Sequence, residues 1–167
     1  MNNKKHSKLQ RANISAVPKI TIGNEKQFEA SLGRFTEPLN MQKLGCSIVE
    51  LNPGKKAWPY HLHYGNDELF LIIKGSGIIR YDDEEYTISQ GDVIYTPSGD
   101  GTAHQIINNS DETLQYYAIS STDSPEVAYY PDSDKYGSYF TGGEDNSRKS
   151  FIAKGSSNAG YYEDEDE

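Results

Sequence analysis

Residues 54–75 read GKKAWPYHLHYGNDELFLIIKG, a short run with alternating character, a break, and a longer apolar run. The apolar run is rich in Ile, Leu and Phe and shows no helical period, which is typical of a strand buried on both faces. The break at 64–67 contains Gly, Asn and Asp, which favour tight turns. We therefore predict two neighbouring antiparallel strands joined by a short connection.

Similar short runs continue on both sides of this stretch, from residue 46 to residue 120. Turn residues, mainly Gly, Pro, Asn, Asp and Ser, separate them. Strands at this close, regular spacing indicate an antiparallel sandwich or barrel, so we predict an all-β fold. The expected strands are residues 46–51, 59–63, 68–75, 77–81, 85–89, 92–96, 104–108 and 113–120.

The flanking residues carry weaker signals. Residues 17–22 could add a strand, and residues 25–33 could form one helical turn or a loop. Residues 122–141 hold two prolines and four tyrosines, and we expect an ordered, extended segment that wraps the barrel. The predicted organisation is a flexible N-terminal segment (1–15), the barrel with its wrapping C-terminal segment (16–141), and a disordered acidic tail (142–167).

Three of the four histidines lie on the predicted strands. Alternate residues of a strand share a face, so His61 and His63 point the same way. An antiparallel neighbour can bring Glu68 opposite this pair, and His104 opens a later strand. Three imidazole nitrogens and one carboxylate suit a divalent first-row transition metal that keeps open positions for a ligand. We therefore predict a metal site made by these four residues.

An ordinary interpretation of the histidines exists as well. A lone histidine on a strand is usually a half-buried polar residue, and two neighbouring histidines arise often by chance. His6, in a polar stretch, illustrates that case. The metal interpretation is favoured because three histidines and a carboxylate fit one geometric plan.

The spacing of these residues resembles the two sequence motifs of the cupin superfamily. The first motif, a glycine, HxH, a glutamate and a second glycine, is matched by Gly54, His61, His63, Glu68 and Gly75. The second motif, a glycine, Pro-x-Gly, a histidine and an asparagine, is matched by Gly91, Pro97, Gly99, His104 and Asn108. The resemblance covers residues 44–120. The segments before His61 and before His104 are longer than is usual in the family, which affects the loops at the cavity mouth.

The resemblance implies a double-stranded β-helix, or jelly roll, with a metal bound by His61, His63, Glu68 and His104. Family members use Mn, Fe, Ni, Zn or Co, so the identity of the ion stays open. The ligand types alone disfavour Ca and Mg, which prefer shells of oxygen atoms. The chain looks most like small single-domain bacterial cupins.

The expected function is to bind or act on a small polar molecule at this metal. An enzyme would be of the dioxygenase type with iron, or of the isomerase type with zinc or manganese. A sugar-phosphate isomerase would need a cation for the phosphate, and none between residues 45 and 120 has an established place in the cup. No general base stands out, so the catalytic residues remain unknown, and a non-catalytic binding or sensing module is the alternative.

Composition narrows the partners and the location. The net charge of −9 argues against sequence-independent binding of nucleic acid. No apolar stretch is long enough to span a membrane, and no secretory signal follows the basic N-terminus, so the cytoplasm is expected. Cys46 is the only cysteine, so no internal disulfide can form. Leu69, Leu71 and Ile73 are apolar on the face opposite Glu68, and a homodimer is the simplest way to cover them.

Overall fold

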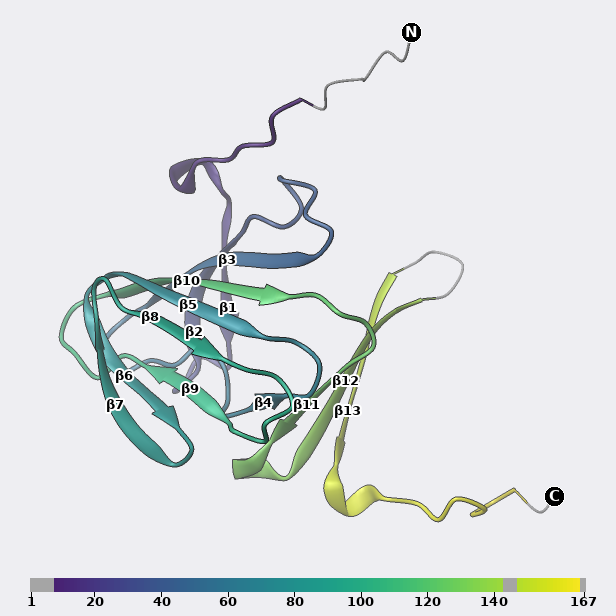
Figure 1. The fold of residues 1–167 in the computed structure, drawn as a ribbon. Coiled ribbons are helices and arrows are strands. Elements are labelled where there is room, and N and C mark those ends of the chain that lie inside the picture. The colour runs from purple at the N-terminus through teal and green to yellow at the C-terminus, as the bar shows by residue number, and fades with distance from the viewer. Residues whose placement is uncertain (1–7, 143–146, 166–167) are drawn as a thin grey trace, which may run out of the picture.

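Two antiparallel sheets form the body of the molecule in the computed structural model, which describes residues 8–142 and 147–165 (Figure 1). The larger sheet has the strand order β1-β2-β3-β10-β5-β8. Its strands are β1 (Lys19–Gly23), β2 (Glu29–Arg34), β3 (Leu44–Leu51), β10 (Leu114–Ser121), β5 (Glu68–Lys74) and β8 (Val93–Thr96). The smaller sheet consists of β7 (Glu84–Ser89), β6 (Ser76–Tyr81) and β9 (His104–Ile107). The predicted all-β fold is confirmed.

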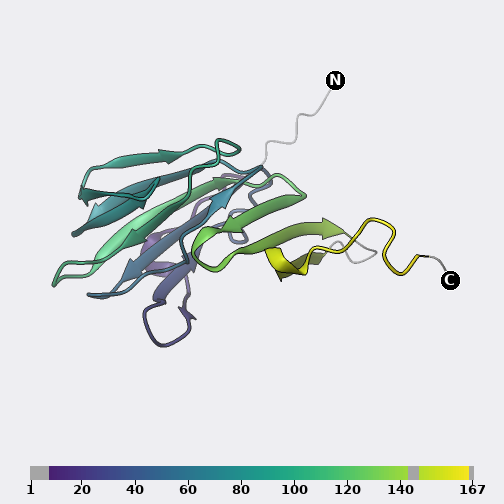
Figure 2. The same cartoon turned by 90° about the horizontal axis from the view of Figure 1, so that it is seen from below.

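A third sheet lies at one end of the barrel (Figure 2). It consists of β13 (Ser147–Lys154), β12 (Lys135–Gly142), β11 (Glu126–Tyr130) and β4 (Leu62–His63). Because β4 pairs with β11, the C-terminal strands are joined to the segment that carries the first histidine pair. The helical elements of the described residues are three short 3-10 turns, η1 (Ile14–Ala16), η2 (Pro131–Ser133) and η3 (Gly155–Ser157).

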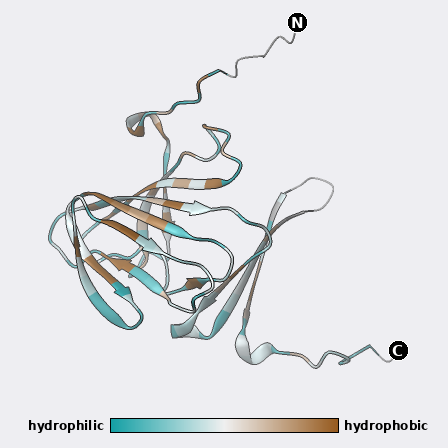
Figure 3. Ribbon diagram, viewed as in Figure 1, coloured by the Kyte–Doolittle hydropathy of each residue, from teal (hydrophilic) through white to brown (hydrophobic). Residues whose placement is uncertain are grey.

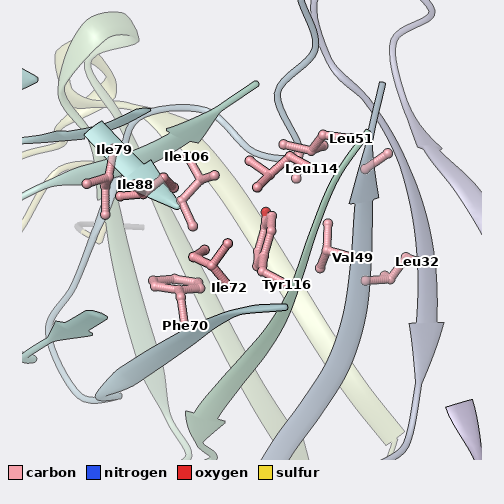
Figure 4. Close-up of a cluster of buried hydrophobic side chains, with 12 residues drawn as sticks. Leu32, Val49, Leu51, Phe70, Ile72, Ile79, Ile88, Ile106, Leu114 and Tyr116 are labelled. Carbon is pink, nitrogen blue, oxygen red and sulfur yellow. The ribbon is translucent and has the colours of Figure 1, made fainter. Parts of the chain in front are cut away.

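The main hydrophobic core fills the space between the two barrel sheets (Figure 4). The hydrophobic residues gather on the barrel strands (Figure 3). Inward-facing residues alternate along each strand, as the period of a pleated strand requires. From the larger sheet they include Leu32, Val49, Leu51, Phe70, Ile72, Leu114 and Tyr116. From the smaller sheet they are Ile79, Ile88 and Ile106.

The N-terminal flank is more regular than expected. Residues 17–22 largely form β1, as predicted, but the helical turn or loop expected at 25–33 is wrong for its second half. The side chain of Asn24 accepts hydrogen bonds from the backbone of Lys26 and Phe28 and closes a tight turn. After this turn, β2 is held between β1 and β3, and Ala30 and Leu32 are buried against the core.

The C-terminal region also differs from the expected disordered tail. Strand β13 pairs with β12 along its whole length, from Ser147 opposite Gly142 to Lys154 opposite Lys135. The large side chains Phe151 and Ile152 are exposed, so backbone pairing rather than burial forms this strand. Residues 143–146 and 166–167, within the predicted tail, lie outside the described residues, as do residues 1–7 of the predicted N-terminal segment.

The outer face of β5 is partly covered by the chain itself. Ile73 packs with a second hydrophobic cluster around Val17, Phe35 and Ile48. The N-terminal segment thus performs part of the covering role for which we expected a second subunit, and the homodimer stays a prediction. No helix in the described part of the chain has the length and apolarity needed to cross a membrane.

Candidate metal centre

The candidate ligands come together because four separate strand segments meet at one end of the barrel. His61 and His104 are direct cross-strand neighbours, with hydrogen bonds of 3.1 Å and 2.8 Å between their backbones. His63 lies on β4 beside β11, and Glu68 begins β5 between β10 and β8. The strand parity expected for Glu68 is correct, since Phe70 and Ile72 point from the same face into the core.

The carboxylate of Glu68 is the centre of the group. Its Oε2 atom lies 2.8 Å from Nε2 of His104, 3.5 Å from Nε2 of His63 and 4.0 Å from Nε2 of His61. One ligand atom each from His61, Glu68 and His104 lie within 4.8 Å of one another. His63 is adjacent to this trio, with its ring centroid 4.9 Å from that of His61.

Two of the histidine rings are oriented by acceptors outside the group. Nδ1 of His61 lies 2.8 Å from the carbonyl oxygen of Pro59, and Nδ1 of His63 lies 3.0 Å from Oε1 of Glu126. Oxygens of this kind accept hydrogen bonds, so in the neutral ring each Nδ1 carries the proton and each Nε2 has the lone pair. Both lone pairs therefore belong to the nitrogens that face Glu68, the arrangement that metal-binding histidines commonly show.

The protonation states also suit a metal. Burial lowers the pKa of His61 to about 3, with His104 acting in the same direction and Glu68 opposing. For Glu68, burial alone would raise the pKa, but the hydrogen bond from His104 and the nearby His63 and His61 outweigh it and lower the pKa to about 2. Near neutral pH, His61 is thus neutral and Glu68 ionised, the forms in which these side chains bind metal ions.

Unsatisfied polar atoms concentrate at the same place. In the described part of the chain, three buried side-chain atoms lack a hydrogen-bond partner: Oγ1 of Thr96, Nδ1 of His104 and Oε2 of Glu126. Thr96 is the cross-strand partner of Glu68, and Glu126 bonds His63. Because folded proteins satisfy nearly all buried polar groups, their clustering here indicates a functional rather than a purely structural site.

A cleft of about 480 Å³ opens beside the group. His61, His63 and Glu68 line it from the barrel, and Tyr130 and Tyr139 line it from the C-terminal strands. The ring of Tyr130 stacks on that of His61 at a centroid distance of 5.9 Å, and its hydroxyl lies 2.7 Å from the hydroxyl of Tyr139. A small molecule in this cleft would contact the candidate ligands on one side and the two phenols on the other.

Several residues of the cleft were not predicted from the sequence. Glu126, Tyr130 and Tyr139 follow the second motif, and Arg34 precedes the first. For Arg34, the alternation of Ala30, Leu32 and Arg34 contained a usable signal, once residues 29–34 are recognised as a strand. For Glu126 the sequence contains no local signal, because its role depends on the pairing of β11 with β4.

Comparisons with known proteins agree with this architecture. The family model described as a cupin domain matches residues 47–120. An uncharacterized protein of Methanocaldococcus jannaschii is 33% identical over 60 residues, which cover 36% of this chain and 46% of that protein. An oxalate-binding protein of Thermotoga maritima is 31% identical over 71 residues, which cover 42% of this chain and 56% of that protein. The chain thus spans about half the length of these curated relatives.

The likeness to solved structures extends beyond the motif region. The crystal structure of a sugar phosphate isomerase of the cupin superfamily from Silicibacter pomeroyi superposes with a TM-score of 0.76. The match covers 88% of this chain and 94% of the other, at 21% sequence identity, and so concerns the fold. Together, the family match over residues 47–120 and the similar barrel show that this part of the chain resembles a cupin domain in sequence and in fold.

Proposed function

We propose that this chain holds one divalent first-row transition metal with His61, His63, Glu68 and His104 and binds a small polar molecule in the adjacent cleft. The observation that carries the proposal is the convergence of three imidazole Nε2 atoms on one carboxylate oxygen, at 2.8 to 4.0 Å. Mn, Fe, Ni, Zn and Co all accept such a mixed nitrogen and oxygen set.

The surrounding residues supply what a metal site needs besides its ligands. The carbonyl of Pro59 and the carboxylate of Glu126 fix two histidine rings, so little ordering is required when the ion binds. A cleft of about 480 Å³ is within the usual size range for small-molecule sites. Four protein ligands leave about two positions of an octahedral ion for the molecule, and a bound ion would supply Lewis acidity to a coordinated oxygen.

An isomerase-type enzyme is the second candidate, and the hydroxyl pair of Tyr130 and Tyr139 favours it. Both phenols line the cleft, so their hydroxyls can form hydrogen bonds with an oxygen of a bound molecule. Burial raises the pKa of Tyr130, with Tyr139 acting in the same direction, so this phenol stays protonated and acts as a donor. A non-catalytic binding module would use the same cleft without turnover.

Elemental analysis of the purified chain tests the metal site. The wild-type chain should carry about one first-row metal ion per chain, and His63→Ala and His104→Ala should lose most of it. His6→Ala changes the fourth histidine and serves as the matched control, which should keep the ion. A metal-free wild-type chain that also refuses added Mn, Fe, Ni and Zn contradicts the proposal.

The enzyme and the binding module are separated by turnover. Metal-loaded protein is incubated with sugars, keto acids and catechols, and products are followed by mass spectrometry. Conversion that disappears in His104→Ala supports an enzyme, whereas saturable binding without conversion supports the binding module. The identity of the native ion narrows the chemistry, since iron favours dioxygenase reactions and zinc or manganese favours isomerisation.

A further inference from the structure

Arg34, the last residue of β2, lies at the inner face of the larger sheet. On this strand Ala30 and Leu32 are both buried in the main core. Because alternate residues share a face, Arg34 continues the same row, but it is exposed, so the row leaves the core at this residue. Arg34 also lines the cleft that is lined by His61, His63 and Glu68.

The inner face of the larger sheet changes from apolar to polar toward the cleft. Three successive rows of cross-strand neighbours show the change. The first row is apolar and consists of Leu32, Val49, Tyr116 and Ile72. The second mixes the two classes and consists of Arg34, Ser47, Ala118 and Phe70. The third is more polar and includes Gly45, Ser120 and Glu68. The cleft therefore has a polar floor that extends from Glu68 to Arg34.

The guanidinium of Arg34 is not used by the fold. Across residues 8–142 and 147–165, no hydrogen bond or ion pair of its side chain is present, and it is the one lysine or arginine that lines the cleft. Other cations of the barrel are engaged: Lys19 pairs with Glu50, Lys55 with Glu29, and Arg80 with Asp83 and Asp132.

We propose that Arg34 binds an anionic group, a phosphate or a carboxylate, at the end of the molecule that lies away from the metal ligands. This inference rests on the proposed function of the cleft. A guanidinium matches both anions because its planar fork can donate two parallel hydrogen bonds. Ser47 and Ser120, on the same floor, offer further hydroxyl donors.

The spacing of the strands sets the length of the molecule. Arg34 is three strands from Phe70, the inward-facing neighbour of Glu68, which corresponds to about 14 Å between backbones in a flat sheet. Both side chains shorten this span. Oxalate, whose carboxylates are directly bonded, would reach one end of the cleft, whereas a sugar with an anionic group on its terminal carbon would reach both.

Apart from Arg34, the charged residues that line the described cleft are carboxylates, which repel an anionic group. Glu37 and Asp123 line it as well, and neither forms an ion pair with Arg34. With Glu68 and Glu126 beside the histidines, carboxylates outnumber cations among the lining residues. No general positive field attracts anions, so among the described lining residues Arg34 is the cation that an anionic group can contact besides a bound metal ion.

Calorimetry on manganese-loaded protein tests the proposal with three hexoses that differ at carbon 6. Glucose 6-phosphate carries a phosphate there, glucuronate a carboxylate, and glucose a neutral hydroxyl. Wild-type protein should bind at least one of the two anions about tenfold or more tightly than glucose, and Arg34→Gln should remove that preference. Arg34→Lys should restore part of it, and the matched control Arg11→Gln, in the exposed N-terminal segment, should leave it unchanged.

The outcomes separate this inference from the proposed function. A preference for the phosphate or for the carboxylate identifies the anion. Equal affinity of wild-type and Arg34→Gln protein for both anions, with manganese retained, overturns the role of Arg34 and leaves the metal site intact. If elemental analysis finds that the wild-type chain takes up none of Mn, Fe, Ni and Zn, the metal proposal fails instead. Inorganic phosphate binding to the metal-free protein then tests Arg34 by itself, and no loss in Arg34→Gln overturns the inference.

Discussion

Nδ1 of His63 lies 3.0 Å from Oε1 of Glu126, although the two residues are 63 positions apart in the sequence. His63 lies within residues 47–120, which match the cupin domain, whereas Glu126 opens β11, beyond the matched region. Glu126 is 4% exposed, and its other oxygen has no hydrogen-bond partner. Burying a carboxylate is costly unless it is paired, and Glu126 is paired with His63, so the C-terminal strands contribute a side chain to the candidate site.

Replacing Glu126 should weaken metal binding without removing a ligand. We expect Glu126→Ala to lower metal affinity about 10- to 100-fold, because His63 loses the acceptor that orients its ring. Glu126→Gln should lose less, since its amide oxygen can still accept from Nδ1. Competition with a chromophoric chelator measures both. Glu85→Ala, on the exposed strand β7, is the control, and an affinity for Glu126→Ala equal to that control would disprove the orienting role.

Removing the metal should lower the melting temperature. An ion present at 100 times its dissociation constant stabilises the folded chain by about 2.7 kcal/mol, which corresponds to roughly 5–10 °C for a chain of this size. Differential scanning calorimetry with and without a chelator measures the shift. His104→Ala should respond little to the chelator, because it has already lost a central ligand. Identical wild-type transitions in both conditions would count against a bound ion.

The fold could be predicted because its signals are local. Alternation, turn residues and strand length are properties of neighbouring residues, and they place the barrel strands from β3 to β10 within a few residues of their observed bounds. Parity also placed Glu68 on the face of Phe70 and Ile72. Pairing of β13 was missed because the strand is polar and exposed, so composition indicated disorder although backbone hydrogen bonds to β12 order it.

The outer part of the site could not be predicted because it depends on long-range contacts. Nothing near Glu126 in the sequence indicates His63, since the two meet through the pairing of β11 with β4. Arg34 was overlooked for a related reason. The pattern of residues 25–33 indicates a helical turn or a loop, and Arg34 lies outside residues 45–120, where a cation for a phosphate is expected.

Glu50 should contribute stability that depends on pH. Its carboxylate accepts hydrogen bonds from Lys19 and Gln115 and so links β3 to β1 and β10. Burial would raise the pKa of Glu50, but these two partners outweigh it and lower the pKa below its usual 4.5. A lowered folded-state pKa stabilises the protein above the unfolded-state value, and the gain is lost as pH falls through the folded-state value.

Thermal melts from pH 3 to pH 7 test this relation. Wild-type protein should exceed Glu50→Gln by up to about 1 kcal/mol above pH ~5, since the pair is partly exposed. The difference should shrink as Glu50 becomes protonated below pH ~4. Glu112→Gln changes an exposed carboxylate and should show no such trend. A gap between wild type and Glu50→Gln that stays constant with pH would mean that the charge of Glu50 is not responsible.

Asn108 belongs to the second motif, but its side chain stabilises the barrel rather than the candidate metal site. It shares the second motif with His104, yet its side chain is fully buried at the far end of β9 and serves the following turn. Its amide donates to the carbonyls of Leu51 and Glu112, at 2.8 and 2.7 Å, and its oxygen accepts from the backbone of Ser110 at 3.0 Å. These bonds satisfy groups that have lost access to water.

Asn108→Ala should therefore destabilise the chain by about 2–4 kcal/mol, because it leaves buried carbonyls without donors. Its metal content, once folded, should equal that of the wild type, since the side chain bonds only turn residues and β3. Asn109→Ala, at the exposed neighbouring position, should change neither quantity. Denaturant unfolding and elemental analysis on the same samples give both readouts. If Asn108→Ala instead kept its stability and lost the ion, Asn108 would act on the metal site. The assignment of a purely structural role to Asn108 would then be incorrect.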